Sequence, residues 1–518
     1  MRTRVNAPQP PHRPSYSLTR ETLAANGPSG EGRGRRIDYA GDMTRRSILL
    51  AALVASGCAE VPPPAASTKV PATPAVSSAA VASTPATSAP SARPAAPSPS
   101  QFIEDDLPGA MAKARAEGKA LFLDTWAPWC HTCLSMQAYV LNDPSLRALA
   151  DRVVFAAIDT DRPSSAAFLE HHAIKAWPTF FVIDPAKDRV VGYWSGSGSV
   201  GEIRGLIEES LAQLAGSAPG DEAARAFAEA RAAHAAGELD RAIRTYETAV
   251  ATSAPTWPSR SAAILGWIQT IHGAKDWMRC ARVGVSHLGV ITGAALPADA
   301  SSYVLDCAEH LPEGPDRVAA RKAALARLQA ITARPPEGAT VDDRADALGI
   351  LAGALEASKD AAGAKKAHEA RLALLEAAVR GAKTPDEAHT FDYLRAGTYL
   401  ALGRGDEAVR MLEQRERELP TAYEPPARLA GVLFKTGKLP EAQAAVDRAI
   451  ARAYGPRKLR YLKLRADIQK KRGDAAGELA TLRDEVKGYE VLPPGQASPE
   501  SLADARGRLA DAEARAPR

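Results

Sequence analysis

The stretch that decides the fold is residues 120–133, which read ALFLDTWAPWCHTC. Its first five residues form a short, nearly continuous apolar run, which is typical of a strand in a sheet covered on both faces. Two cysteines follow three residues apart, at the start of a helical stretch that we expect to continue to about residue 150. A helix N-terminus carries unpaired N–H groups and a partial positive charge, which favour a thiolate at the first cysteine. Cys130 is therefore the expected nucleophile of thiol–disulfide exchange, and Cys133 is placed to resolve the mixed disulfide.

Two polar residues near the cysteine pair are candidates for tuning it. His131 lies between the cysteines and can offer the thiolate a positive charge or a hydrogen bond. Asp124 ends the predicted strand, six residues before Cys130. Because burial disfavours the charged form of a carboxyl group, we expect a raised pKa, which makes Asp124 a candidate proton acceptor for Cys133.

The residues around this stretch alternate between helical and strand patterns. Together they predict a mixed sheet flanked by helices over residues 101–216. The expected helices are 106–118, 164–172 and 200–215, and the further expected strands are 153–158, 179–183 and 190–194.

This pattern resembles the thioredoxin superfamily. Tryptophan directly before the CxxC motif, an acidic residue six positions earlier, and a proline after the third helix are the shared features. The run 134–149 is most similar to the C-terminal domain of the membrane thiol reductase DsbD. The resemblance implies an α/β thioredoxin-like fold with Pro178 in a cis peptide bond beside the dithiol. It also implies a substrate-binding surface made of Trp129, His131, Trp177, Pro178 and Thr179.

The sequence departs from the family at two places. His-Thr stands between the cysteines where thioredoxin has Gly-Pro, and Phe155 stands where a buried lysine is expected. The direction of the redox chemistry therefore stays open, with reduction or isomerisation favoured by the similarity to DsbD. The chemistry implies no cofactor beyond the redox-active cysteine pair, and it implies a partner electron donor.

The sequence gives less support to two other roles for the cysteine pair. Half of a zinc site would need a second pair of ligands, but Cys280 and Cys307 are not a CxxC motif, and His171 and His172 have the pattern of surface residues. A structural disulfide over so short a loop would remove little chain entropy. We therefore predict no metal.

Residues 222–495 carry the pattern of a helical array, the name used below for this region. A glycine followed five residues later by alanine occurs at Gly237, Gly403 and Gly437, with a degraded copy at Gly473. The last three glycines are 34 and 36 residues apart (437 − 403 and 473 − 437), which resembles the tetratricopeptide repeat (TPR). The resemblance implies an all-α solenoid that binds a peptide or protein ligand. The alternative is a structural spacer, and residues 257–390 keep helical amphipathicity without the repeat signature.

Three further features of this half stay open. The basic run 457–472 is either a solvated helix face or a docking site for an acidic partner or lipid headgroups. Cys280 and Cys307 either pair in an oxidising compartment or are small core residues. Residues 496–518 are a helical or disordered tail.

The first hundred residues have the pattern of an export signal and a linker. Residues 1–42 are a disordered leader or lie upstream of the true start. Residues 43–58 join a basic start, a short apolar run and small residues before Cys58, which resembles a bacterial lipoprotein signal. A plain secretory signal is the alternative. Residues 59–100 are rich in Pro, Ala and Ser and are expected to be a disordered stalk.

Composition limits the class of function. The formal net charge of the 518 residues is only +4, so no global field favours nucleic acid as a partner. The sequence therefore predicts an exported thiol–disulfide oxidoreductase on the periplasmic side of the bacterial envelope, anchored to the membrane through lipid on Cys58. Its partners are disulfide-containing proteins, an electron donor and a ligand of the helical array. The alternative is a non-enzymatic scaffold.

Overall fold

The computed structural model of the protein describes residues 101–216, 221–496 and 498–515. The predicted leader, signal, lipidation site at Cys58 and stalk all lie outside the described residues. No helix in the described ranges is both long enough and apolar enough to cross a bilayer.

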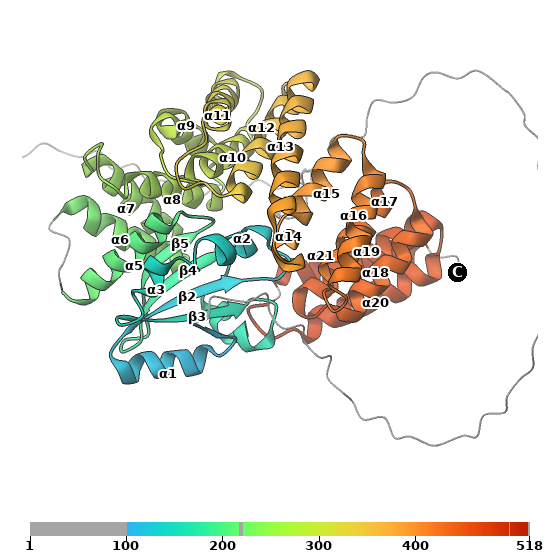
Figure 1. Ribbon diagram of the computed structural model, residues 1–518, viewed down its shortest axis with the longest axis horizontal. Helices are drawn as coiled ribbons and strands as arrows, with labels where there is room; N and C mark the ends of the chain where they lie inside the picture. The colour runs from blue at the N-terminus through green and yellow to red at the C-terminus, as the bar shows by residue number, and fades with distance from the viewer. Residues whose placement is uncertain (1–100, 217–220, 497, 516–518) are drawn as a thin grey trace, which may run out of the picture. The chain divides into compact units, whose positions relative to one another are not determined.

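The described residues contain one five-stranded mixed sheet, in the order β1-β3-β2-β4-β5, which confirms the predicted fold class (Figure 1). Strands β1, β3 and β2 are parallel, whereas β4 runs antiparallel to β2 and β5 antiparallel to β4. Strand β1 was not predicted. The strands are β1 Phe102–Glu104, β2 Ala120–Trp126, β3 Val153–Asp159, β4 Thr179–Asp184 and β5 Arg189–Ser195.

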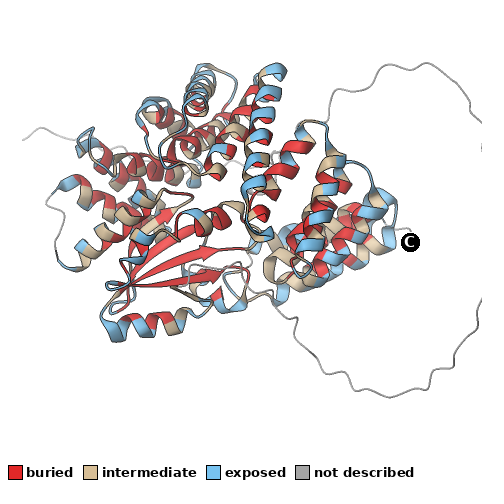
Figure 2. Ribbon diagram, in the orientation of Figure 1, coloured by how far each residue is buried: buried red, intermediate tan, exposed pale blue. Residues whose placement is uncertain are grey.

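Both faces of the sheet are covered, as the apolar run at residues 120–124 indicated. Alternate residues of β2 enter different cores: Phe122 packs on one face with Phe155 and Phe180, while Leu121 and Leu123 pack on the other. The central strands are buried along their whole length (Figure 2). The helices of this redox domain, residues 101–216, are α1 Leu107–Glu117, α2 His131–Tyr139, α3 Pro144–Arg147, α4 Ala166–His171 and α5 Val200–Leu214.

The expected single helical stretch after the cysteines is wrong, because it is two helices. Helix α2 ends at Tyr139, and α3 begins at Pro144. A proline disfavours helical backbone at the residue before it. Asp143 in that position instead has extended backbone and caps α3, its carboxylate accepting a hydrogen bond from the Ser145 N–H at 2.8 Å.

The helical array is all α-helical apart from one short 3-10 turn, and it extends to Arg515. Neighbouring helices pack in pairs, such as α6 with α7, α12 with α13 and α17 with α18. Its helices are α6 Glu222–Ala235, α7 Leu239–Thr252, α8 Arg260–Gly273, α9 Trp277–His287, α10 Leu296–Glu309, α11 Pro315–Ala333, α12 Val341–Ala357, α13 Ala361–Gly381, α14 Pro385–His389, α15 Asp392–Ala401, α16 Gly405–Glu418, α17 Glu424–Lys435, α18 Leu439–Arg452, α19 Gly455–Arg472, α20 Ala475–Val491 and α21 Pro499–Arg515.

The repeat glycines lie in left-handed turns between helices, as their spacing predicted. Gly237, Gly403, Gly437 and Gly473 have φ angles of 76°, 71°, 80° and 77°. This left-handed region is costly for other residues, so glycine ends one helix and lets the next pack back on it.

Cys280 and Cys307 form a disulfide that links α9 to α10, which answers the question that the sequence left open. Both residues are fully buried.

The redox domain and the helical array share an apolar core. One cluster runs from Phe122 and Phe155 of the sheet through Ile203 and Ile207 of α5 to Tyr246 of α7 and beyond. Helix α6 packs on β5, and α12 contacts α2 (Figure 1). The array therefore lies against the domain that carries the cysteine pair.

Candidate active site

The cysteine pair lies at the N-terminus of α2, as predicted. Cys130 is the N-cap residue, and its Sγ accepts a hydrogen bond from the Cys133 N–H at 3.0 Å. The two cysteines form a disulfide, so the structure describes the oxidised state. After reduction the same N–H group would face the Cys130 thiolate, which is the helix-terminus stabilisation expected from the sequence.

Asp124 is buried in the middle of the sheet, on the strand that leads to the cysteine pair. It pairs with Ala157 on β3 and with Phe180 on β4, and only 1% of its surface is exposed. Its Oδ2 accepts one long hydrogen bond from Gln137 Nε2 at 3.4 Å, and its Oδ1 has no hydrogen-bond partner among the described residues. Burial raises the pKa of Asp124 to about 7, in the direction predicted. A carboxyl group with such a pKa can accept or release a proton near neutral pH.

The predicted cis proline is present at the Trp177–Pro178 bond, directly before Thr179 at the start of β4. Trp177 donates a hydrogen bond from Nε1 to Thr160 Oγ1 at 2.9 Å, and its ring meets that of Trp129 edge-on at 5.2 Å. Both tryptophans pack against the apolar cluster that contains the two cysteines. The structure thus packs two of the predicted substrate-binding residues, Trp129 and Trp177, against the dithiol, and Pro178 and Thr179 follow Trp177 directly in the chain.

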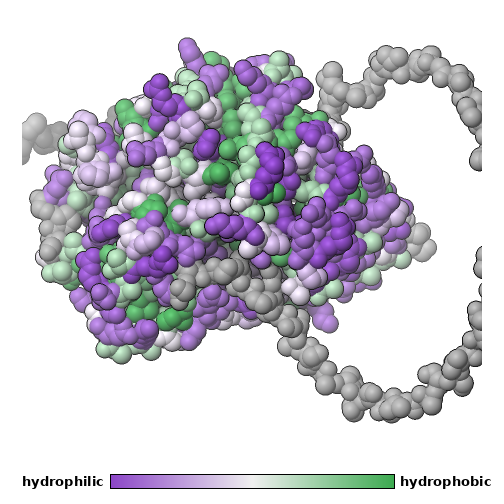
Figure 3. Space-filling model, in the orientation of Figure 1, coloured by the Kyte–Doolittle hydropathy of each residue, from purple (hydrophilic) through white to green (hydrophobic). Residues whose placement is uncertain are grey.

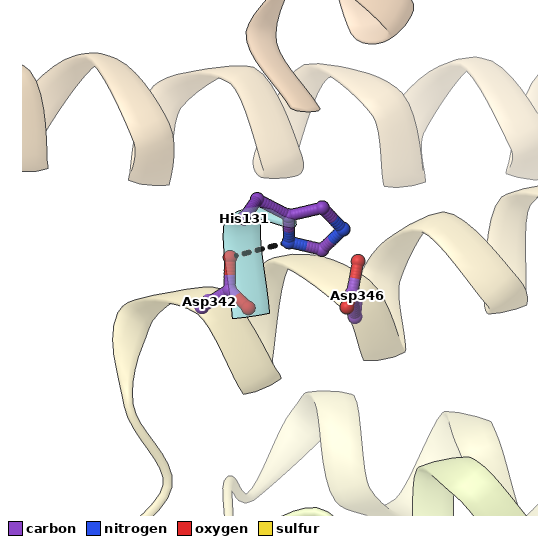
Figure 4. A group of neighbouring side chains, drawn as sticks. All are labelled: His131, Asp342 and Asp346. Atoms are coloured by element: carbon purple, nitrogen blue, oxygen red, sulfur yellow. Dashed lines mark hydrogen bonds and ion pairs between the residues drawn. The ribbon is translucent and has the colours of Figure 1, made fainter. Parts of the chain in front are cut away.

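His131 contacts the helical array. Its Nδ1 lies 2.9 Å from Asp342 Oδ1 on α12 (Figure 4). Its ring stacks on that of Tyr393 on α15, with the ring centroids 5.3 Å apart. Burial lowers the pKa of His131, but the Asp342 and Asp346 carboxylates outweigh this effect and raise it. His131 therefore lies partly buried against acidic residues that are far from it in the sequence.

Trp129, on the other side of Cys130, also contacts the array. Its Nε1 donates to Asp161 Oδ2 at 2.8 Å, and the guanidinium of Arg457 lies 4.3 Å from the ring centroid. Arg457 opens the basic run 457–472 on α19, so this end of the run docks on the redox domain. Hydrophilic side chains gather over the C-terminal helices in Figure 3, consistent with a solvated face for much of the rest.

The loop after β3 is the third point of contact. The Tyr454 hydroxyl donates to the Asp159 carboxylate, and Gln496 donates to the carbonyls of Thr160 and Arg162 at 3.0 and 2.6 Å. Burial raises the pKa of Asp159 to about 8. The segment that supports Trp129 and Trp177 is therefore held from both domains.

Three residues of the site have the chemistry of metal ligands. His131, Asp342 and Asp346 each offer an atom within 4.8 Å of the others (Figure 4). The Arg371 guanidinium lies 3.4 Å from Asp346, so a cationic side chain already faces one of the two carboxylates.

A cavity of about 1090 Å³ lies beside the C-terminal end of α2, next to the start of α5 and helices α10–α12. Tyr139, Val200 and Arg327 are among its lining residues, and none of the predicted site residues lines it. The cysteine pair is instead covered by side chains.

Comparison with known proteins supports the assignment of both the thioredoxin-like domain and the helical repeats. A family described as thioredoxin-like matches residues 102–185, and a tetratricopeptide repeat family matches residues 399–468. Similar curated proteins include the thiol:disulfide interchange proteins DsbD 1 of Pseudomonas aeruginosa, 32% identical over 106 residues, and DsbD of Yersinia enterocolitica, 32% identical over 109 residues. Each match covers 20% of this chain and 17% and 19% of the relatives, so the chain spans less than a fifth of their length.

Among solved structures, a tetratricopeptide repeat protein from Parabacteroides merdae aligns over 56% of this chain and 99% of its own, with 13% identity and a TM-score of 0.37. At so low a score the repeat assignment rests on the family match and on the glycine turns. The chain therefore joins a thioredoxin-like domain with a CxxC cysteine pair to a region of tetratricopeptide repeats.

Proposed function

We propose that the protein is an exported thiol–disulfide oxidoreductase that acts on disulfides of protein substrates, and that its helical array binds a peptide or protein partner. The observation that carries the proposal is the Cys130–Cys133 pair at a helix N-terminus, packed with Trp177, the residue before the cis proline, in a domain that also buries the Asp124 carboxyl group. The similar curated proteins are named as thiol:disulfide interchange proteins.

The proposed reaction starts from the reduced pair. The Cys130 thiolate attacks a substrate disulfide, a Cys130–substrate bond forms, the substrate S–S bond breaks, and one substrate sulfur leaves as a thiolate. Asp124 accepts the proton of Cys133. The Cys133 thiolate then attacks the Cys130 sulfur of the mixed disulfide and releases the second substrate thiolate. Two electrons pass from the cysteine pair to the substrate, and the Cys130–Cys133 disulfide forms. A partner dithiol then reduces the pair again.

The proposed location rests on the sequence of residues 43–58 and on the lipidation site at Cys58. Export to an oxidising compartment is compatible with the Cys280–Cys307 disulfide, since such bonds persist mainly outside the cytosol. Labelling with radioactive palmitate tests the anchor: label on Cys58 is expected, and its absence would mean that no lipid is attached there.

The test of the activity is reduction of insulin by the reduced protein with dithiothreitol as the donor. We expect Cys130→Ser to abolish the reaction and Cys133→Ser to accumulate a mixed disulfide, whose partner mass spectrometry identifies. The double variant Cys280→Ser/Cys307→Ser is the control and should retain activity, because this pair lies in the array. Activity that survives Cys130→Ser would eliminate the enzymatic proposal.

One observation favours a second candidate function. Cys130 is only 5% exposed and Cys133 is fully buried, while both neighbours of Cys130 contact the array. A scaffold that uses the thioredoxin-like domain for binding would have no need of an accessible thiol. In that case the wild type and Cys130→Ser would behave alike in every redox assay.

A further inference from the structure

Both residues that flank Cys130 in sequence are held by the helical array. Arg457 of α19 lies over the ring of Trp129 at 4.3 Å. Asp342 of α12 and Tyr393 of α15 hold His131, by an ion pair of 2.9 Å and by ring stacking at 5.3 Å. The array thus contacts the residues on both sides of Cys130 in the sequence.

These contacts combine buried and partly buried charged side chains. Asp342 is 1% exposed, and Asp346 and Arg371 extend the cluster around His131. On the other side, the Asp161 carboxylate accepts the Trp129 hydrogen bond and faces Arg457. These contacts hold the array against the residues beside Cys130, and this docked state is the closed arrangement.

The closed arrangement limits what can approach Cys130. A folded protein of about 100 residues has a radius of gyration of about 13 Å and presents a surface disulfide on a broad convex face. Helices that lie within contact distance of both Trp129 and His131 would collide with such a face. A small disulfide, or one on an extended chain segment, needs only a narrow approach to the sulfur.

We propose that α12, α15 and α19 form the outer wall of the redox site and restrict its substrates to disulfides on small molecules or on extended chain segments. Asp342, Tyr393 and Arg457 are then specificity-determining residues supplied by the array. This inference rests on the proposed function and narrows its substrate class.

The first test measures access to Cys130 without any catalysis. The reduced full-length protein is treated with N-ethylmaleimide or with a maleimide that carries a long polyethylene glycol chain. Peptide mass spectrometry then follows loss of the unmodified Cys130 peptide. For each sample we divide the labelling rate with the small reagent by the labelling rate with the bulky reagent. We expect this ratio to be about tenfold larger for the protein than for a free peptide of the sequence WCHTC. Equal ratios would overturn the proposal.

The variants test which residues form the wall. Arg457→Ala and Tyr393→Ala should each lower the ratio about tenfold, the change expected if a lost contact makes opening easier by about 1.4 kcal/mol. Arg457→Lys keeps the charge but loses the planar stacking, and it replaces Arg457→Ala if that variant melts at a lower temperature. The matched control is Lys470→Ala, an exposed cation on the same helix about 20 Å further along it. Folded variants that keep the wild-type ratio would overturn the assignment.

A second assay separates this inference from the proposed function. Insulin reduction by Arg457→Ala should rise relative to reduction of glutathione disulfide, whereas Lys470→Ala should change neither rate. An unchanged insulin-to-glutathione ratio in a folded Arg457→Ala overturns the substrate restriction. If no form of the protein reduces either substrate while the labelling ratios behave as expected, the proposed activity is wrong and the wall is supported.

Discussion

Replacement of Asp124 by asparagine should stabilise the redox domain at neutral and alkaline pH and leave its stability unchanged in acid. The carboxyl group lies on β2, enclosed between β3 and β4, and among the described residues its one side-chain hydrogen bond comes from Gln137 at 3.4 Å. Asparagine keeps the size of the side chain and cannot ionise, so it removes the cost of a buried charge without opening a cavity.

The magnitude follows from the pKa. Burial raises the pKa of Asp124 from 3.8 to about 7, and each pKa unit corresponds to 1.36 kcal/mol. Well below pH 3.8 the carboxyl group is protonated in both the folded and the unfolded chain, so it costs nothing. As the pH rises toward 7 the unfolded chain ionises first, and the folded state loses up to about 4 kcal/mol. The variant should therefore gain about 0.5 kcal/mol at pH 4 and up to about 4 kcal/mol at pH 8.

Hydrogen exchange read by mass spectrometry on peptides from β2 and β4 measures this difference, after correction for the intrinsic pH dependence of exchange. The control is Asp151→Asn, which changes an exposed carboxyl group in the same domain and should alter the free energy of opening by less than about 0.5 kcal/mol. A difference between Asp124→Asn and wild type that is absent, or that is the same at pH 4 and pH 8, would refute the reasoning.

Three further predictions concern the array. Removal of the Cys280–Cys307 disulfide, which closes a sequence separation of 27 residues, should cost about 3 to 4 kcal/mol in the loop-entropy treatment, measured by exchange of α9 and α10. In Asp342→Asn the pKa of His131 should fall, because one of the carboxylates that oppose the effect of burial on this pKa is gone, and an NMR titration of the imidazole detects the change. In the wild type, the stabilising ion pair is lost as the pH rises through the raised pKa of His131. Gly437→Ala, at φ 80°, should cost about 1 kcal/mol, seen as faster exchange in α17 and α18.

Features encoded by neighbouring residues could be predicted from the sequence. The apolar run before the cysteines predicts β2, and its position in a covered sheet predicts the raised pKa of Asp124. The repeat glycines predict their own left-handed turns because the steric requirement is local. The cis bond at Pro178 followed from the resemblance carried by a short motif.

Two local features were missed for physical reasons. Strand β1, Phe102–Glu104, is three residues long, too short to show a period, and it exists because it pairs with β3. The end of α2 at Tyr139 depends on Pro144 and on the cap formed by Asp143, which compete with an otherwise helical pattern.

The sequence by itself determined the two kinds of domain and the place of the cysteine pair at the start of a helix, because strand, helix and turn preferences act over a few residues. Only the tertiary structure decided what surrounds them: that Cys280 pairs with Cys307, that Asp342 binds His131 across 211 positions, and that Arg457 covers Trp129. These contacts depend on how successive helices pack and on where the array returns to the redox domain. A local sequence pattern cannot predict such long-range contacts, because the same charged residues would give the same pattern on a helix that contacts nothing.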